Sequence, residues 1–546
     1  DAGYGSDQSG KTLRLRRLDT TTGAPIWATS VPAFPAQVSY YSPGSFDRSP
    51  TLVVNADSVA IAYAASFGSG YNDPGLSYVT LLDRTTGTPL WRKLLQEEGQ
   101  TLTYTSPPEF DGAGNVFIGV GTNLPCNFND HCGRQFIYKL SAQTGDVLWR
   151  FDRTAPPSRS IEGSGQVFPQ TFEVFNNDVI VAGTFSGTTH TLLRISGVDA
   201  SLMWSSDLFA GGTYSVEFYR QDAQHIIVSS WPQSARVDVG NGNVIWTSSS
   251  APFACTQNCY TYDQLVLPGG DLITVGEGDS KASIARAHND GSGQVDHWQI
   301  DSGNPSIRSI ASFVRQTPSG KTMVQGSHGF RTSAGKLYIL YEIDPTNGGL
   351  LSQQVISSRA NDATSESLLP LVTKFADDNH MLFNGFLVSE TLPWTSGAGL
   401  LDTTIVAHGN LQLSIITDHR HVVAGQTLGF QLLATYTGDQ PISGAQLIAG
   451  TLLQGGTQNL TCVVQAASNC VIDNRSGTID ATFDIQPGGS VTISGELKVV
   501  EMVESSYLSG TVSGPVSLSE SSTVDNFSRS NMVQALFANG FEAAQP

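Results

Sequence analysis

The chain has 546 residues, of which 56 are glycine, and its formal net charge is −19 at pH 7. So acidic a chain disfavours nucleic acid as a partner, because its surface repels phosphate groups. The sequence also contains no apolar stretch of about 20 residues, which is the length that would predict a membrane-spanning helix. Charged residues make up only 14% of the chain, against about 25% in ordinary globular proteins, and this polar, glycine-rich composition is typical of short strands joined by many turns.

The N-terminus carries a phosphate-loop pattern without its structural context. Residues Gly5–Thr12 read GSDQSGKT and fit the pattern G-x4-G-K-[ST]. Such a loop needs a buried strand before it and a helix after it. Only four residues precede Gly5, and the strand-like run Leu13–Arg16 follows. The sequence therefore predicts no nucleotide site here.

A ten-residue unit recurs along the first four hundred residues, which indicates a repeat architecture. Six of the eight tryptophans close a copy of this unit. The units read LDTTTGAPIW to Trp27, LDRTTGTPLW to Trp91, LSAQTGDVLW to Trp149, ISGVDASLMW to Trp204, VDVGNGNVIW to Trp246, NDGSGQVDHW to Trp298 and IDPTNGGLLS to Ser352.

Each unit predicts the turn of a β-hairpin. Asp or Ser at its second position opens a turn by hydrogen-bonding the backbone ahead, and glycine at its sixth position, such as Gly87 or Gly145, favours a positive φ. The tryptophan begins the return strand, where its large ring would pack between neighbouring sheets. A second hairpin precedes several units, as in the strand Gly114–Gly121, so each repeat supplies the four short strands of a propeller blade.

The pattern L-D-x-x-T-G-x-x-L-W resembles the repeat of PQQ-like propellers, a family that includes quinoprotein dehydrogenases and the outer-membrane assembly lipoprotein propeller. The resemblance covers residues 1–408 and implies a β-propeller, but it is weak for function. It implies seven blades if the hairpin around Leu369–Phe386 completes the first blade, and eight if Leu401–His408 supplies further strands.

The six cysteines form three local pairs, namely Cys126 with Cys132, Cys255 with Cys259, and Cys462 with Cys470. Close pairs in even number predict disulfides and an oxidising compartment. Metal binding is the alternative, because Cys126 and Cys132 flank a histidine, but the sequence has no C-x2-C knuckles of the kind that bind zinc. The first residue is Asp1, which signal-peptide removal or a fragment boundary would equally leave. We therefore expect a secreted or bacterial cell-surface protein.

The repeat stops near Gly409, and residues 409–535 read as alternating strands, for example Leu411–Ile415 and Ser490–Leu497. Their order resembles the DUF11-type immunoglobulin-like modules of bacterial surface proteins. That resemblance implies an all-β chain in which an immunoglobulin-like β-sandwich follows the propeller and serves as a spacer, stalk or adhesive module. Residues 536–546 form a tail whose LFANGFE stretch resembles the endings of some proteobacterial secreted proteins.

One pair of metal-ligand residues lies in this second domain. His419 and His421 are two residues apart on an expected strand, so their side chains share a face, and Asp418 is adjacent. Two histidines without a third ligand are more often surface residues, so we predict no metal site.

The motifs of catalysis are absent from the sequence. Quinoprotein dehydrogenases typically carry adjacent cysteines beside the quinone, and this chain has no adjacent cysteines, no C-x-x-C-H haem signature and no G-x-S-x-G elbow. We therefore assign no catalytic or cofactor-binding residue and expect no cofactor, although the sequence leaves enzyme activity open.

The predicted function is a non-catalytic binding or scaffolding protein that recognises a protein or a surface glycan. Its C-terminal domain would be a stalk, or would join chains into a filament by head-to-tail self-association. The alternative is a secreted hydrolase or quinoprotein dehydrogenase with its site in the propeller channel. Acid pairs from separate blades could converge there, as in glycosidases.

Overall fold

The computed structural model is built from β-strands, and the described part of the chain contains no helix. It accordingly holds no helix that could cross a membrane. The described residues are 2–4, 12–19, 24–32, 51–66, 75–95, 103–127, 130–154, 171–186, 189–210, 217–230, 233–248, 253, 260–289, 294–300, 307–330, 334–361, 367–388, 395–418, 421–422, 425–451, 456–475, 478–499, 507–523, 525–531 and 533–534.

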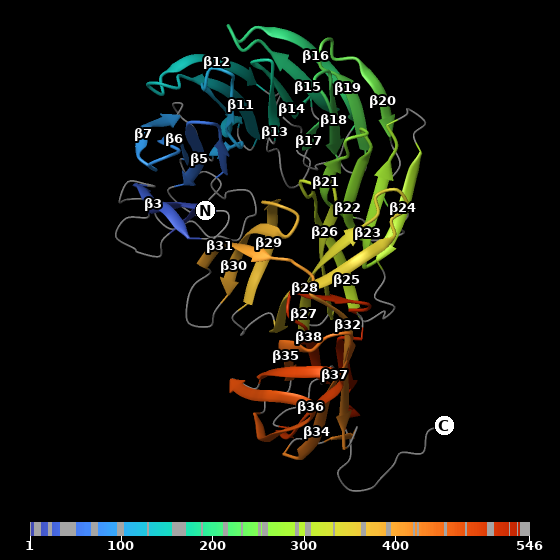
Figure 1. Ribbon diagram of the computed structural model, residues 1–546. Coiled ribbons are helices and arrows are strands. Elements are labelled where there is room, and N and C mark those ends of the chain that lie inside the picture. Colours follow the sequence, from blue (N-terminus) through green and yellow to red (C-terminus); the bar gives the residue numbers. More distant parts are fainter. Residues whose placement is uncertain are drawn as a thin grey trace. The chain divides into compact units, whose positions relative to one another are not determined.

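Eight sheets precede residue 403 among the described residues (Figure 1). Within each sheet the strands follow one another in chain order, except that β8 and β9 of the third sheet both pair with β10. The first four sheets are β1 (Ala2–Tyr4), β2 (Thr12–Leu18) and β3 (Pro25–Pro32); β4 (Thr51–Val54), β5 (Ser58–Ser66), β6 (Gly75–Asp83) and β7 (Pro89–Leu95); β8 (Thr103–Thr105), β9 (Glu109–Phe110), β10 (Val116–Asn127), β11 (Asp130–Leu140) and β12 (Val147–Thr154); and β13 (Thr171–Phe175), β14 (Asp178–Ser186), β15 (Thr189–Ile195) and β16 (Leu202–Ala210).

The next four sheets continue the same arrangement. They are β17 (Glu217–Arg220), β18 (His225–Ser230), β19 (Gln233–Asp238) and β20 (Val244–Ser248); β21 (Tyr260–Val266), β22 (Leu272–Gly278), β23 (Lys281–Ala287) and β24 (Val295–Ile300); β25 (Ile307–Gln316), β26 (Thr322–Phe330), β27 (Ala334–Ile343) and β28 (Leu350–Asn361); and β29 (Ser367–Phe375), β30 (His380–Val388) and β31 (Thr395–Asp402). The hairpin around Leu369–Phe386 thus pairs with β31 in a three-stranded sheet, and the blade count stays a prediction.

The repeat turn has the predicted chemistry. In the second unit, Asp83 Oδ1 accepts hydrogen bonds from the N–H groups of Thr85 and Thr86 at 2.9 and 2.7 Å. Gly87 follows with a φ of +73°, a left-handed conformation that glycine adopts without steric cost. In the fourth unit Ala200 occupies this position with a φ of +62°. The turn therefore tolerates a side chain when the flanking strands fix its geometry.

Residues from 407 onward form an eight-stranded sheet around a core that includes Leu411, Phe430, Leu447, Phe483 and Ile493. The strands are β32 (Ala407–Thr417), β34 (Thr427–Gly438), β35 (Ile442–Thr451), β36 (Thr457–Arg475), β37 (Thr478–Lys498), β38 (Tyr507–Ser513), β39 (Leu518–Glu520) and β40 (Phe527–Asn531), and β33 (His421–Val422) pairs separately with β41 (Val533–Gln534). That this domain is immunoglobulin-like stays a prediction.

The long strand β37 changes partner along its length. Its first part, Ile479–Ile485, pairs with β35, whereas Ser490–Lys498 pairs with β34. Between them lies the sequence QPGG, where a Cβ on Gly489 would lie 2.5 Å from the carbonyl oxygen of Ala466. This glycine allows β36 and β37 to bend together at a corner, so that one hairpin lines two sides of the core.

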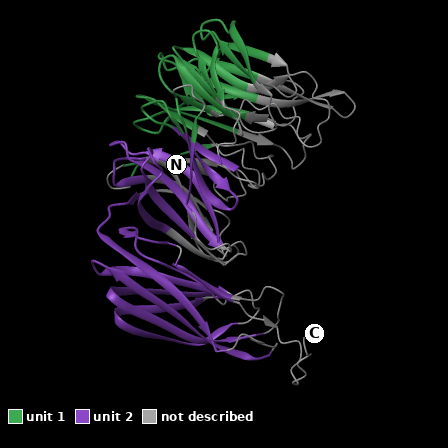
Figure 2. Ribbon diagram, turned by 90° about the vertical axis from the view of Figure 1, so that its right-hand side faces the viewer, with its two compact units in different colours: residues 1–252, 266–272, 287–295 green, residues 253–265, 273–286, 296–546 purple. Residues whose placement is uncertain are grey.

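The chain divides into two compact units (Figure 2). Unit 1 comprises residues 1–252, 266–272 and 287–295, and unit 2 comprises residues 253–265, 273–286 and 296–546. Unit 2 therefore contains the C-terminal domain together with some of the repeat sheets. It spans the predicted boundary at residue 408.

Candidate functional site

The tryptophans of the repeat lie between successive sheets. The indole N–H of Trp27 donates to the carbonyl oxygen of Arg84 at 2.9 Å, and that of Trp149 donates to Gly197 at 3.0 Å. Both acceptors occupy the third position of the next unit. A Cβ on Gly87 would lie 2.6 Å from the Trp27 ring, so this glycine also makes room for the indole. Trp91 and Trp204 make the same hydrogen bond to Ala142 and Val239.

In three of the units whose turns the structure describes at this point, a cation shares this contact. The sequence interpretation missed it. Lys139 lies across the strand pair from Trp149, and its Nζ donates at 2.8 Å to the same Gly197 carbonyl oxygen. The ammonium group also pairs with Asp111 at 2.9 Å, in a hairpin of its own sheet. Arg17 and Arg194 repeat the arrangement beside Trp27 and Trp204. We call this indole-and-cation contact the sheet latch.

The structure bears on only part of the predicted cysteine pairing. Cys462 and Cys470 form a disulfide with Cα atoms 6.6 Å apart, at the corner of β36. The side chains of Cys126 and Cys132, and all of Cys255 and Cys259, lie outside the described residues, so those two pairs stay predictions.

Other sequence motifs lie partly outside the described residues. The phosphate-loop residues before Thr12, His419, the side chain of His421 and the tail 536–546 are in this group. Asp418 is described, and its Oδ2 accepts the backbone N–H of Gly429 at 3.0 Å. The described part of the chain contains no group of three or more His, Cys, Asp or Glu side chains suited to a metal ion.

Two carboxyl groups lie near each other on neighbouring sheets of unit 1. Glu109 lies on β9 and Glu173 on β13, and Arg220 follows on β17. Burial raises the pKa of Glu109 to about 7, and the nearby Glu173 adds to the shift. Burial raises the pKa of Glu173 as well, but the charge of Arg220 opposes that rise. Burial thus favours the protonated form of both carboxyl groups, and the charge of Arg220 opposes this effect at Glu173.

A second cluster lies on β21, β22 and β25 in unit 2 (Figure 1). The carboxylate of Glu277, only 1% exposed, accepts hydrogen bonds from Arg308 Nε at 2.7 Å and Nη2 at 2.5 Å. The Tyr262 hydroxyl donates to the same carboxylate at 3.3 Å. Tyr260 and Tyr262 are 48% and 41% exposed. We call these four residues the tyrosine–arginine patch.

Ser309, His328 and Tyr341 form a chain of hydrogen bonds that resembles a catalytic arrangement. The three residues are buried, so a substrate could not reach them. Ser309 Oγ lies 2.6 Å from His328 Nδ1, and the Tyr341 hydroxyl lies 2.7 Å from His328 Nε2. Each of the three residues is at most 1% exposed. Buried polar groups need such partners, so we interpret this chain as a structural network of the β25–β28 sheet.

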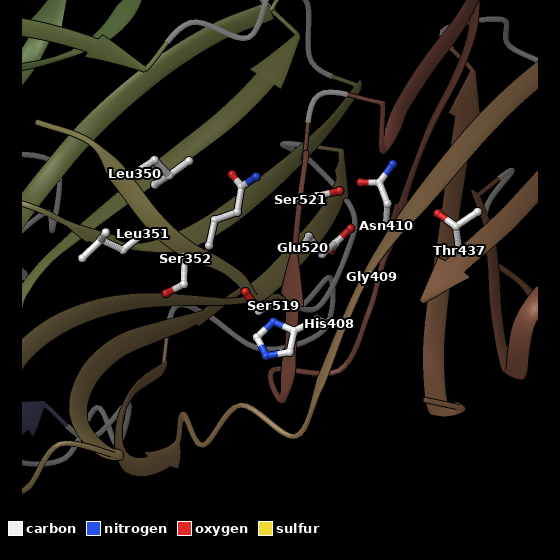
Figure 3. A pocket seen from close by; sticks show the side chains of 11 residues that line it. Leu350, Leu351, Ser352, His408, Gly409, Asn410, Thr437, Ser519, Glu520 and Ser521 are labelled. Carbon is white, nitrogen blue, oxygen red and sulfur yellow. The ribbon is translucent and has the colours of Figure 1, made fainter. Parts of the chain in front are cut away.

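A pocket of about 450 Å³ opens where β28 meets the C-terminal domain, within unit 2 (Figure 3). Leu350 and Leu351 line one side, and His408, Asn410 and Ser519 contribute polar groups. We call it the junction pocket. Ser352, in the place of the repeat tryptophan, also lines it.

The junction next to this pocket is closely bonded. Gln354 is 2% exposed, and its Nε2 donates at 2.9 Å both to Thr403 and to Val516 carbonyl oxygens. The Thr523 hydroxyl donates to Gln353 Oε1 at 3.2 Å. Thr403 occupies the third position of an eighth unit that begins Leu401-Asp402. Gln354 therefore bonds the carbonyl that a repeat tryptophan would have bonded, and it fastens the C-terminal domain at the same time.

Comparison with protein families matches residues 133–377 to the family described as outer membrane protein assembly factor BamB. The matched segment coincides with the central copies of the repeat and their four-stranded sheets. The chain therefore contains a β-propeller of the PQQ-like repeat type. Its four-stranded sheets are blades, and the sheet latches join successive sheets. No curated protein sequence matches the chain.

Many solved structures are similar to this chain, including the following three. One is the dihydro-heme d1 dehydrogenase NirN in complex with DHE, with 13% identity, 73% of each chain covered and a TM-score of 0.40. The Neurospora crassa Pan2 WD40 domain has 9% identity over 59% of this chain and 84% of that chain, with a TM-score of 0.31. A protein of unknown function from Dyadobacter fermentans has 12% identity, coverages of 65% and 94%, and a TM-score of 0.34. At such low scores they do not decide the fold, which rests on the family match, the repeat and the strand order.

Proposed function

We propose that this protein is a secreted or cell-surface binding and scaffolding protein, with the propeller as the recognition platform and the C-terminal domain as a fixed support. The observation that carries the proposal is the junction at Gln353 and Gln354. The two buried side-chain amides form hydrogen bonds with the C-terminal domain across this junction. A support that holds bound partners at a constant spacing needs such a fixed junction. The description of the matched family as an assembly factor also favours a role in protein interaction.

The location of the protein tests this proposal directly. Intact cells of the native host are treated with a protease that cannot enter them, and the chain is followed by antibody in the cell, surface and medium fractions. We expect the chain in the medium, or on the surface where the protease removes it. A chain that is recovered intact from the cytoplasm would contradict the proposal.

A second candidate function is a hydrolase that uses Glu109 and Glu173, because paired carboxyls with different pKa values suit acid and base roles. If Glu109 is the general acid, glycoside hydrolysis would decline as the pH rises above about 7, the pKa to which burial raises this group. The assay measures reducing ends released from soluble polysaccharides by the native chain and by Glu109→Gln. Release that disappears in the variant would favour the hydrolase, and equal release from both proteins would exclude this pair.

A further inference from the structure

The tyrosine–arginine patch has the form of a ligand surface. Tyr260 and Tyr262 lie two residues apart on β21, so their side chains share a face of the strand. Their ring centroids are 6.3 Å apart and their planes differ by 21°, which makes a row of two nearly parallel rings. Gly276 on β22 lets the backbone of β21 come close at this point, since a Cβ there would lie 1.9 Å from the carbonyl oxygen of Tyr260.

Arg308 adds a fixed set of hydrogen-bond donors beside the rings. Its Nε and Nη2 both bond the buried carboxylate of Glu277, so the plane of the guanidinium group is held by two bonds. The side chain remains 45% exposed, and no acceptor for its Nη1 is found among the described residues, so this group could donate to a ligand. A donor that is oriented in advance loses little entropy on binding.

The charge of the patch restricts the ligand class. The carboxylate of Glu277 neutralises Arg308, so the patch offers little net attraction to an ion. The chain as a whole carries a charge of −19, which repels acidic polymers at a distance. A neutral ligand with many hydroxyl groups fits better, because its apolar faces can pack on tyrosine rings while its hydroxyl groups bond the arginine.

A protein partner fits the patch less well than a sugar chain. A specific protein interface buries about 800 Å² on each partner, and its fully buried core is more apolar than its rim. Among the described residues of β21 and β25, the exposed large apolar side chains are the two tyrosines, with no exposed aliphatic side chain beside them. Resting on the proposed binding function, we propose that the tyrosine–arginine patch binds a neutral glycan.

Native gel electrophoresis through immobilised polysaccharide tests this assignment. The probes are soluble β-glucan, galactomannan and the acidic polygalacturonate, each cast into a gel in a concentration series. We expect at least one neutral polysaccharide to retard the chain and polygalacturonate to retard it less. Tyr260→Ala and Tyr262→Ala should each weaken the retardation about tenfold, as truncation of a central aromatic contact does.

The control is Leu148→Ala, which removes a 53% exposed side chain from β12 and should leave the retardation unchanged. Because Tyr260 is 48% exposed, its variant should keep a melting temperature close to the native one, so that weaker retardation of this variant reports lost binding and not lost folding. No retardation by either neutral probe, unchanged retardation of Tyr260→Ala, or stronger retardation by polygalacturonate would each overturn the assignment. If one of these results is obtained but the chain is found on the cell surface, the assignment of a neutral glycan is wrong and the proposed binding and scaffolding function is retained.

Discussion

At the residue scale, most of the chemistry depends on a few buried polar groups that bond across strands. Asp83 was predictable, because Asp at the start of a turn hydrogen-bonds the backbone ahead of it. Lys139 and Gln354 were not, because a lysine before the unit or a glutamine after it has the same appearance as a surface residue in the sequence. Their roles depend on which carbonyl the next sheet presents. The pairing between Glu277 and Arg308, which are 31 residues apart, could not be predicted from the sequence either.

Glu520 gives a prediction of pH dependence. It is 4% exposed, and burial raises its pKa to about 8, while hydrogen bonds from Asn526 and the Leu411 N–H oppose the rise. A carboxyl whose pKa is higher in the folded protein holds its proton more tightly there. The free energy of unfolding should therefore fall as the pH rises from about 4.5 to about 8, and then level off.

The variant Glu520→Gln should lose this fall. Urea unfolding at pH 5 and pH 9 should show that the native chain loses a few kcal/mol between the two, whereas the variant loses much less. Glu496 on β37 is only partly buried and accepts hydrogen bonds from Gln458 and Asn459. It provides a control as Glu496→Gln, which should follow the native chain. An equal fall in native chain and Glu520→Gln would contradict the assignment to this carboxyl.

At the element scale, the repeat made the hairpins and their turns predictable, because each unit contains the residues that its own turn requires. The inter-sheet contacts were predictable only for the tryptophans. The sheet latch predicts that each of these tryptophans contributes to the free energy of unfolding. Trp149→Ala removes a partly buried ring, its hydrogen bond to Gly197 and its contact with Phe117, whose ring centroid lies 5.6 Å away.

We expect this substitution to lower the free energy of unfolding by about 2–4 kcal/mol, somewhat less than for a fully buried tryptophan. Its neighbour Leu148 is 53% exposed, so Leu148→Ala should change the value by less than about 0.5 kcal/mol. Denaturant unfolding measures both. Similar small effects for the two variants would mean that the latch does not stabilise the sheets.

The disulfide of the C-terminal domain gives a second prediction at this scale. The bond between Cys462 and Cys470 closes a short loop at the corner of the β36–β37 hairpin. Replacing both cysteines by alanine should lower the free energy of unfolding by about 2–3 kcal/mol, because a nine-residue loop gains freedom in the unfolded chain. Urea unfolding of the double variant measures the loss, and no loss would show that the corner is rigid without the bond.

At the scale of the whole molecule, the sequence predicts a change from repeat to C-terminal domain near residue 408, but it does not predict the way in which the two are joined. That join depends on Gln354 contacting Val516, 162 positions further along the chain, and no local pattern records such a contact. Replacing Gln354 by alanine leaves the buried carbonyl groups of Thr403 and Val516 without this donor. It should lower the free energy of unfolding of unit 2 by about 2–4 kcal/mol.

The scaffolding function requires that the β25–β28 blade and the C-terminal domain form one rigid support. A distance measurement between two spin labels tests this most directly, with one label at Val463 on the C-terminal domain and the other at Lys321 in the turn before β26. Val463 is 64% exposed, and the Lys321 side chain is 46% exposed. We predict one narrow distance distribution in the native chain, which broadens when Gln354 is replaced by alanine. A broad distribution in the native chain would contradict the rigid support and, with it, the scaffold.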